Sequence, residues 1–428
     1  MKLRTGLFLF GALAFLYLLF SAIPYYWIFI TANFIFMYSA VAYILMYLEA
    51  RKLPSPGAPK SWPTVSVIIP SFNSGASIEK CLQSVKAMKY PKPFEVIVVD
   101  DGSTDGTYEK ASSFEGVKVI RRPYNSGKAS ALNDGIAQAT GELVACIDSD
   151  TYPEPDVLEK LIPKFENKKL AASTVLICAQ EKGNLLQRLQ EIEYYIAFGF
   201  WDKCLSLFDG LIITPGPMSM YRRKVLLEVG GFDETNITED MEIALRLQER
   251  GYKVGCTVDA RVHTEVPSTL RGLFRQRVRW YRGKVVNGKK YSHMLFNPKF
   301  SDVGLFVFPY SFVVEFATLI MASRTILFYF SDFYSKIVET LGWLSINALP
   351  RVPITTDYLA MQSVSYYFLI SLFVWGFIVV SAFEISRKSL KLSHLPTLAI
   401  FLPLFYLFTS TAYFVGLVRE VNGSPYKW

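Results

Sequence analysis

The chain is short of charge and of the residues that build disulfides and zinc sites. Only 19% of its 428 residues are charged, against about 25% in an ordinary soluble protein. Its five cysteines are scattered without a C-x-x-C pair, which excludes a disulfide framework or cysteine zinc site and favours reduced thiols in a cytosol-facing domain. Because the three histidines are also unclustered, any bound metal must rest on carboxylates, which favours Mg²⁺ or Mn²⁺ over zinc.

Uncharged apolar runs take the place of the missing charge, and they lie at both ends of the chain. Gly6–Ile23 and Trp27–Leu48 are each long enough to cross a hydrocarbon core and predict a helical hairpin. A cleaved signal peptide is the alternative for the first run. Three later runs are also candidates for membrane helices: Val303–Phe330, Tyr366–Glu384 and Leu395–Val418. The semi-polar stretch 332–364 has room for one more helix. Basic residues on both sides of the hairpin predict a multi-pass cell-membrane protein whose next domain is cytoplasmic.

Strand and helix patterns alternate between these apolar ends. The strand-like runs are Thr64–Pro70, Phe94–Asp101, Val117–Arg122 and Gly141–Asp150. Amphipathic stretches between them are Ala76–Met88 and Ser130–Ala139. This order predicts an α/β domain with a largely parallel sheet and a ligand site at the carboxyl ends of its strands. The expected organisation is a hairpin over 1–50, a cytoplasmic domain over 60–267, an interfacial amphipathic segment over 268–300 and a membrane region over 301–428.

Acidic residues cluster where that ligand site should lie. Asp100 and Asp101 end one strand, and Asp148 and Asp150 end another, with period-two spacing that points the latter pair to one side. Glu239 and Asp240 stand in the first turn of a predicted helix. Turn formation or the helix dipole explains each pair singly, but neither explains their common location. Two carboxylates facing one way are also suitable ligands for a divalent metal that bridges a diphosphate.

A strongly basic stretch, "FRQRVRWYRGK" over Phe274–Lys284, precedes the later apolar runs. On a helix, Gln276, Arg279 and Trp280 share one face by their i, i+3, i+4 spacing. The other bases are expected to face anionic lipid head groups; they are Arg275, Arg277, Arg282 and Lys284. The net charge of +8 fits an anionic ligand or membrane surface, whereas a nucleic-acid partner is disfavoured because nothing else resembles a nucleic-acid module.

Six motifs in order resemble family 2 glycosyltransferases of the membrane-integrated kind, which includes cellulose, chitin and hyaluronan synthases and ceramide glucosyltransferases. They are "VSVIIPSFN" (Val65–Asn73), "VVDDGSTD" (Val98–Asp105), "NSGKASALN" (Asn125–Asn133), "DSD" (Asp148–Asp150), "TED" (Thr238–Asp240) and "QRVRW" (Gln276–Trp280). The resemblance covers roughly residues 60–290. It implies a GT-A-type, Rossmann-like domain with flanking transmembrane and interfacial helices.

The same resemblance assigns roles to individual residues. It implies a nucleotide-sugar donor bound by Pro70, Asn73, Asp100, Asp101, Lys128, Asp148, Asp150 and Arg279. Lys128 is expected near the base of the nucleotide, and Asp148 and Asp150 are expected to hold Mg²⁺ or Mn²⁺. The expected catalytic residues are Asp240 as general base, Glu239 and Arg279. The expected acceptor-binding residues are Gly216, Gln276 and Trp280. One base without a nucleophilic carboxylate implies inversion at the anomeric carbon.

Two acceptors fit these motifs equally. A processive synthase extends a β-linked polysaccharide at the cytoplasmic face and passes it through its own membrane helices. A lipid glycosyltransferase adds one sugar to a ceramide-like, diacylglycerol or polyprenyl-phosphate acceptor. The polar and aromatic residues within the apolar runs favour the synthase, because such side chains are costly in lipid. A non-catalytic membrane transporter or scaffold is disfavoured by the intact acids. Membrane lipids are expected partners, and the sequence does not indicate partner subunits.

Overall fold

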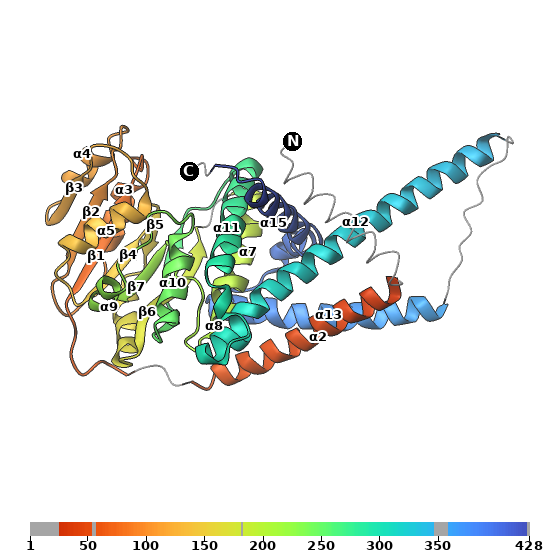
Figure 1. The fold of residues 1–428 in the computed structure, drawn as a ribbon, viewed down its shortest axis with the longest axis horizontal. Helices are drawn as coiled ribbons and strands as arrows, with labels where there is room; N and C mark the ends of the chain where they lie inside the picture. Colours follow the sequence, from red (N-terminus) through yellow and green to blue (C-terminus); the bar gives the residue numbers. More distant parts are fainter. Residues whose placement is uncertain (1–24, 54–56, 181–182, 346–357, 426–428) are drawn as a thin grey trace.

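An α/β domain forms one end of the molecule and long helices form the other (Figure 1). The computed structural model describes residues 25–53, 57–180, 183–345 and 358–425. The long helices are α2 (Tyr25–Ala50), α12 (Phe308–Ser345) and α13 (Tyr358–Ile385). Between the two ends lie α7 (Leu185–Tyr194), α11 (Leu270–Lys290) and α15 (Tyr406–Val421). Helix α11 therefore lies where the domain meets the long helices.

The domain is built on an eight-stranded mixed sheet of order β3-β2-β1-β4-β7-β6-β8-β5. Its strands are β1 (Val65–Ser71), β2 (Glu95–Asp100), β3 (Val117–Arg121), β4 (Leu143–Ile147), β5 (Thr151–Pro153), β6 (Leu170–Ala179), β7 (Met218–Arg222) and β8 (Lys253–Thr264). The first four strands of the chain are parallel to one another and fall on the four predicted runs. β7 runs antiparallel between β4 and β6, so the sheet is mixed rather than largely parallel.

Helices cover both faces of this sheet because β1 is apolar on both sides. Ile68 packs into one hydrophobic cluster with α5 (Lys128–Gln138), while Val67 and Ile69 pack into the other with α3 (Ile78–Lys86). The period-two alternation of a strand sends neighbouring side chains to opposite faces. The remaining domain helices are α4 (Thr107–Ser112), α6 (Val157–Leu161), α8 (Asp202–Leu205), α9 (Arg223–Glu228) and α10 (Glu239–Glu249). Short 3-10 segments are η1 (Ile162–Glu166), η3 (Ser292–Met294), η4 (Pro298–Phe300) and η6 (Leu392–His394).

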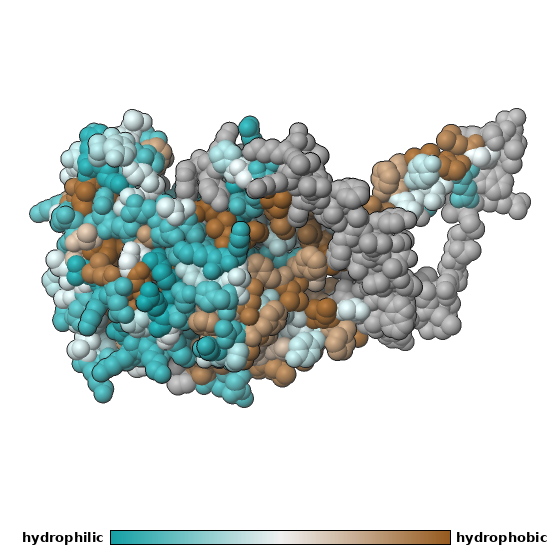
Figure 2. All heavy atoms as spheres, viewed as in Figure 1, coloured by the Kyte–Doolittle hydropathy of each residue, from teal (hydrophilic) through white to brown (hydrophobic). Residues whose placement is uncertain are grey.

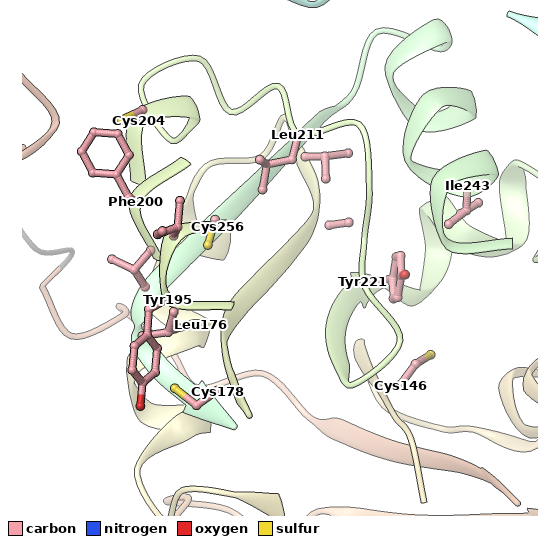
Figure 3. Close-up of a cluster of buried hydrophobic side chains, with 14 of the residues drawn as sticks. Cys146, Leu176, Cys178, Tyr195, Phe200, Cys204, Leu211, Tyr221, Ile243 and Cys256 are labelled. Atoms are coloured by element: carbon pink, nitrogen blue, oxygen red, sulfur yellow. The ribbon is translucent and has the colours of Figure 1, made fainter. Parts of the chain in front are cut away.

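All five cysteines are buried with free thiols. Cys146, Cys178, Cys204 and Cys256 lie within one apolar cluster beside aromatic side chains (Figure 3). They pack as small hydrophobic residues. This agrees with the prediction of reduced thiols from their spacing.

Helices also form at the later apolar runs. The run from Val303 begins with the π-helical turn η5 (Val303–Val307) and continues as α12, and the last run forms α14 (Leu395–Ile400), the π-helical η7 (Phe401–Phe405) and α15. The first predicted run, Gly6–Ile23, lies outside the described residues. Over the described parts of the chain, no helix combines the length and the apolar character that a membrane crossing needs. Membrane crossing therefore stays a prediction.

Candidate active site

Asp100 is the last residue of β2, Asp101 follows it, and the two acids have different surroundings. Asp101 accepts hydrogen bonds from the backbone N–H of Gly127 at 2.8 Å and from Arg122 at 2.8 Å, so it ties the loop before α5 to the sheet. Asp100 is fully buried and accepts from the backbone N–H of Ser103 at 3.3 Å. Its Oδ2 atom has no hydrogen-bond partner among the described residues. The same atom lies 3.7 Å from Nε of Arg121, an ion pair without a hydrogen bond. Because a buried carboxylate oxygen without a hydrogen bond is costly, Asp100 is the better placed of the two to accept a bond from a ligand.

Asn73 and Pro70 lie at the carboxyl end of the neighbouring strand β1. Asn73 has a positive φ of 48°, and its side-chain oxygen accepts from the backbone N–H of Thr104 at 3.0 Å. The next residue, Ser74, shares a 2.7 Å hydrogen bond with Ser149, which stands between the two acids that follow β4. The loops after β1, β2 and β4 are thus joined into one edge.

Lys128 connects the acids of that edge with the acids of α10. Its ammonium forms an ion pair with Asp148 and lies 3.6 Å from Glu239. Burial lowers the pKa of Lys128, but the carboxylates of Asp148 and Glu239 outweigh burial and hold that pKa above its usual range. The resemblance places Lys128 near the nucleotide base, whereas in this structure its amine lies between the predicted metal ligand and the predicted catalytic acids.

Asp240 stands half-buried in the first turn of α10. The hydroxyl and the backbone N–H of Thr214 both donate to its backbone carbonyl, at 2.8 and 3.1 Å, and its carboxylate accepts from the N–H of Met241 at 2.8 Å. Burial first, and then the neighbouring charge of Glu239, raise the pKa of Asp240 to about 6. A carboxylate with a pKa near working pH is suited to general base catalysis. Thr214, which the sequence did not single out, fixes this acid.

Gly216 completes a small cavity that gathers six of the predicted residues. The cavity is lined by Pro70, Lys128, Asp148, Gly216, Glu239 and Asp240, together with neighbouring apolar side chains. An ideal Cβ on Gly216 would lie 2.6 Å from Asp148 Oδ2 and would also overlap the Lys128 ammonium. The absence of a side chain at this position therefore permits the ion pair.

Replacing Gly216 with alanine should weaken nucleotide binding without unfolding the domain. The methyl group displaces Lys128 from Asp148, and a tenfold loss corresponds to about 1.4 kcal/mol. We expect calorimetric titration with UDP and Mn²⁺ to give a dissociation constant about tenfold higher than for the wild type. Gly57→Ala is the matched control, because nothing lies within 4 Å of a Cβ built there. Equal affinities for the two variants would contradict the assignment.

Gln276, Arg279 and Trp280 all lie on helix α11, so their i, i+3, i+4 spacing puts them on one helical face. Arg279 is half-buried, and its charge acts on Asp240 to oppose the rise in pKa of that carboxyl. No hydrogen bond or ion pair joins the Arg279 side chain to another described residue. A guanidinium beside the acids that has no ion pair within the described part of the chain can receive an anionic group.

The other bases of this helix do not face lipid, so that expectation is wrong for three of the four. Arg277 is buried in an ion pair with Glu193. Arg282 is buried against Glu420 and donates to the carbonyl of Ser424 at 2.6 Å, and Lys284 lies 2.6 Å from Glu315. Buried charges require partners, and these partners lie far away in sequence. Arg275 remains exposed.

The pair Asp148 and Asp150 fits a divalent metal that a substrate diphosphate helps to coordinate. Mg²⁺ is commonly held by one or two carboxylates together with phosphates and water. Burial and then the charge of Asp148 raise the pKa of Asp150 to about 6, and the charge of Lys128 only partly opposes this rise. No cluster of three or more His, Cys, Asp or Glu ligands occurs within the described residues. The described residues therefore supply two carboxylates for a metal, and the diphosphate and water would supply the other ligands.

A mixed α/β sheet with acids at the carboxyl ends of its strands is the GT-A arrangement of glycosyltransferases. The chain resembles, with a TM-score of 0.54 and 22% identity, a mannosyltransferase from Pyrobaculum calidifontis solved with GDP-mannose and Mn²⁺; the alignment covers 82% of this chain and 96% of that one. This likeness establishes the fold.

Sequence comparison then assigns one domain of the chain to a family. Residues 66–230 match glycosyl transferase family 2, and the chain therefore contains a family 2 glycosyltransferase domain. It is 33% identical over 223 residues to poly-beta-1,6-N-acetyl-D-glucosamine synthases of Staphylococcus epidermidis and Staphylococcus aureus, a span of 51% of this chain and 54% of theirs. The chain thus spans about half the length of these curated relatives. The predicted family and enzyme class are confirmed at the level of this domain.

Proposed function

We propose that the chain transfers a sugar from a nucleotide-sugar donor to a growing β-linked polysaccharide, with inversion at the anomeric carbon. The observation that carries this proposal is the arrangement around Lys128. Its ammonium forms an ion pair with Asp148 and lies 3.6 Å from Glu239, and the charge of Asp240 also acts on it. Lys128 is thus close both to a residue predicted to bind the donor and to the acids predicted to act on the acceptor. The relation to poly-beta-1,6-N-acetyl-D-glucosamine synthases supports a polysaccharide product.

In the proposed reaction, Asp240 accepts the proton of the acceptor hydroxyl as its oxygen attacks the anomeric carbon. The new glycosidic bond forms while the bond to the diphosphate breaks, and the electron pair leaves with the nucleoside diphosphate. Arg279 receives part of the charge that develops on the leaving group. A divalent cation on Asp148 and Asp150 supplies further Lewis-acid stabilisation when bound. A single displacement converts an α-linked donor into a β-linked product.

A second cavity, of about 330 Å³, supports a saccharide acceptor. It is lined by the aromatic side chains Trp201, Tyr281, Phe401, Phe405, Tyr406 and Tyr413 and by the polar side chains Glu193, Glu315, Thr409 and Ser410. Its size lies within the range of ligand sites, which is about 300–1,000 Å³. Glu193 of this lining pairs with Arg277, whose guanidinium stacks on the ring of Trp280, so two contacts link the cavity to the predicted acceptor residue. Aromatic faces and carboxylates together suit a polyhydroxylated ligand.

Transfer activity tests this proposal with a panel of labelled donors. Purified full-length protein is incubated with UDP-N-acetylglucosamine, UDP-glucose, UDP-galactose or GDP-mannose in the presence of Mn²⁺ or Mg²⁺. We expect one donor to release its nucleotide and EDTA to stop the release. Absence of turnover with every donor, in a protein that still binds UDP, would overturn the assigned reaction.

Transfer should also fall as the pH drops through about 6. With a pKa raised to about 6 by burial and by Glu239, Asp240 is ionised above that pH and protonated below it. Since only the ionised form can accept a proton, kcat at saturating donor and metal should fall about tenfold for each pH unit below the pKa. The pH dependence of kcat measures this directly. A flat profile down to pH 5 would exclude Asp240 as the base.

We also propose that the chain is held in the cell membrane through its long helices, with the catalytic domain on the cytoplasmic side. Hydrophobic residues gather over the helical end of the molecule, away from the hydrophilic α/β domain (Figure 2). Exposed examples are Phe34 and Tyr38 on α2, Phe330 and Ile337 on α12, and Leu369 and Phe373 on α13. Apolar surface of this extent requires cover. The protein should stay in the membrane pellet after alkaline carbonate extraction; release into the supernatant would contradict this proposal.

A further inference from the structure

One buried guanidinium contacts two of the three residues predicted to bind the acceptor. Arg277 is 1% exposed and donates from Nη1 to the side-chain oxygen of Gln276 at 2.8 Å. Its guanidinium carbon lies 4.1 Å from the centroid of the Trp280 ring. A guanidinium stacks on an indole by cation–π attraction, which is strengthened where water is excluded. The orientations of Gln276 and Trp280 therefore depend on where Arg277 is held.

Glu193 holds Arg277 in place from a distant part of the chain. It lies at the end of α7, 84 residues before Arg277, and forms an ion pair with Nη2. A guanidinium buried to this degree is stable only beside a compensating charge. The Glu193 carboxylate also lines the aromatic cavity. The ion pair thus joins the wall of that cavity to the face of α11 that carries Gln276 and Trp280.

The contact also fixes which group Gln276 offers to a ligand. Because an arginine can only donate, it must meet the oxygen of the Gln276 amide. The amide nitrogen of Gln276, with its two N–H groups, is then left to donate to an acceptor hydroxyl. If Arg277 moved, the amide would be free to turn and this preference would be lost.

We propose that Arg277, anchored by Glu193, is the positioning residue of the acceptor site. This inference rests on the proposed sugar transfer and deepens it. Arg277 is too deeply buried to touch the acceptor itself, so its effect passes through Gln276 and Trp280. The donor side of the site, which belongs to Asp100, Asp148 and Asp150, lies on other elements and should not depend on it.

The experiment compares Glu193→Gln with Glu420→Gln in the full-length protein. Glu420 forms the matched ion pair of α11, with the equally buried Arg282. The acceptor probe is a β-1,6-linked N-acetylglucosamine oligosaccharide, used with the donor that the wild type turns over. For Glu193→Gln we expect acceptor kcat/KM to fall roughly ten- to a hundredfold through acceptor KM, with donor KM unchanged. Glu420→Gln should lower the melting temperature and leave acceptor KM alone.

A double-mutant cycle separates positioning from direct contact, since Glu193 could touch an acceptor in the cavity. If Glu193 acts through Arg277, then Glu193→Gln adds no further loss to Arg277→Met. Additive losses would show that Glu193 binds the acceptor directly and would overturn the proposal, as would equal effects of Glu193→Gln and Glu420→Gln on acceptor KM. The fluorescence that Trp280 contributes, obtained by difference against Trp280→Phe, should change in Glu193→Gln only. A wild type that transfers to no acceptor would instead refute the proposed function.

Discussion

Replacing Asp240 with asparagine should slow sugar transfer by about 10²–10⁴-fold while leaving the donor bound. Asparagine keeps the shape and the bond from Met241 N–H to the side-chain oxygen, which is 2.8 Å long in the native protein. It cannot accept the acceptor proton at any pH, and loss of a general base costs about 10²–10⁴-fold in rate. We expect kcat to fall within that range and the dissociation constant for UDP with Mn²⁺ to stay within about twofold of the wild type.

Glu242→Gln is the control for this variant because Glu242 lies two residues further along the same helix. Glu242 is fully buried and forms ion pairs with Arg246 at 2.6 Å and with Lys290 at 2.7 Å. Removing its charge leaves those cations without their partner, which destabilises a protein. Glu242→Gln should therefore lower the melting temperature and leave kcat unchanged. A fully active Asp240→Asn variant would remove Asp240 from its role, and equal rate losses in both variants would attribute the effect to damage of α10.

Asp150→Asn should stop metal-dependent turnover and yet raise the melting temperature of the metal-free protein. The substitution removes one of two carboxylates available to a cation, and losing Lewis-acid stabilisation of several kcal/mol lowers kcat by about 10³-fold. Donor binding should lose its dependence on Mn²⁺. Both effects follow from the placement of Asp150 beside Asp148.

The higher melting temperature expected for Asp150→Asn comes from removing the charge of Asp150 in the metal-free protein. Burial and the charge of Asp148 raise the pKa of Asp150 to about 6 in the folded protein, so the folded state disfavours the ionised form. The resulting destabilisation appears as pH rises above the unfolded pKa and is complete above about pH 6. Asparagine removes it, so the melting temperature should rise at pH 7.5 and change less at pH 4.5. A lower melting temperature at pH 7.5 would mean that Asp150 stabilises the fold and is no open metal ligand.

The local part of this architecture could be predicted from the sequence. The runs that form β2 and β4 are apolar and lead into Asp100 and Asp148, and parallel strands bring their carboxyl ends to one edge. Asp100 and Asp148 therefore lie at the same edge of the sheet. The turn-and-helix signal at Glu239 and Asp240 also placed both acids in the first turn of α10.

The remainder of the sheet depends on long-range pairing. β7 lies antiparallel between β4 and β6 although it follows β6 by about forty residues in the chain, and β6 pairs in parallel with the more distant β8. No local pattern selects such partners, because β6 is buried over its whole length and shows no alternation. Its neighbours are determined by the packing of the complete domain.

The basic helix shows why charge alone is a poor guide to surroundings. The sequence alone does not distinguish the ion-paired bases of α11 from bases that face lipid. The acidic partners come from three different helices, in the pairs Arg277–Glu193, Arg282–Glu420 and Lys284–Glu315. Only the fold reveals which bases are committed to ion pairs. Arg279, which has no such partner among the described residues, is the one that the motif had assigned to the donor.

The size of the labelled product tests the central claim most directly. Full-length protein in nanodiscs is incubated with labelled UDP-N-acetylglucosamine and Mn²⁺, and the product is divided between size-exclusion chromatography and organic extraction. The proposed polysaccharide synthase should yield a high-molecular-weight polymer that appears with the wild type and is absent with Asp240→Asn. A single labelled, organic-extractable species would contradict it and establish transfer of one sugar to a lipid.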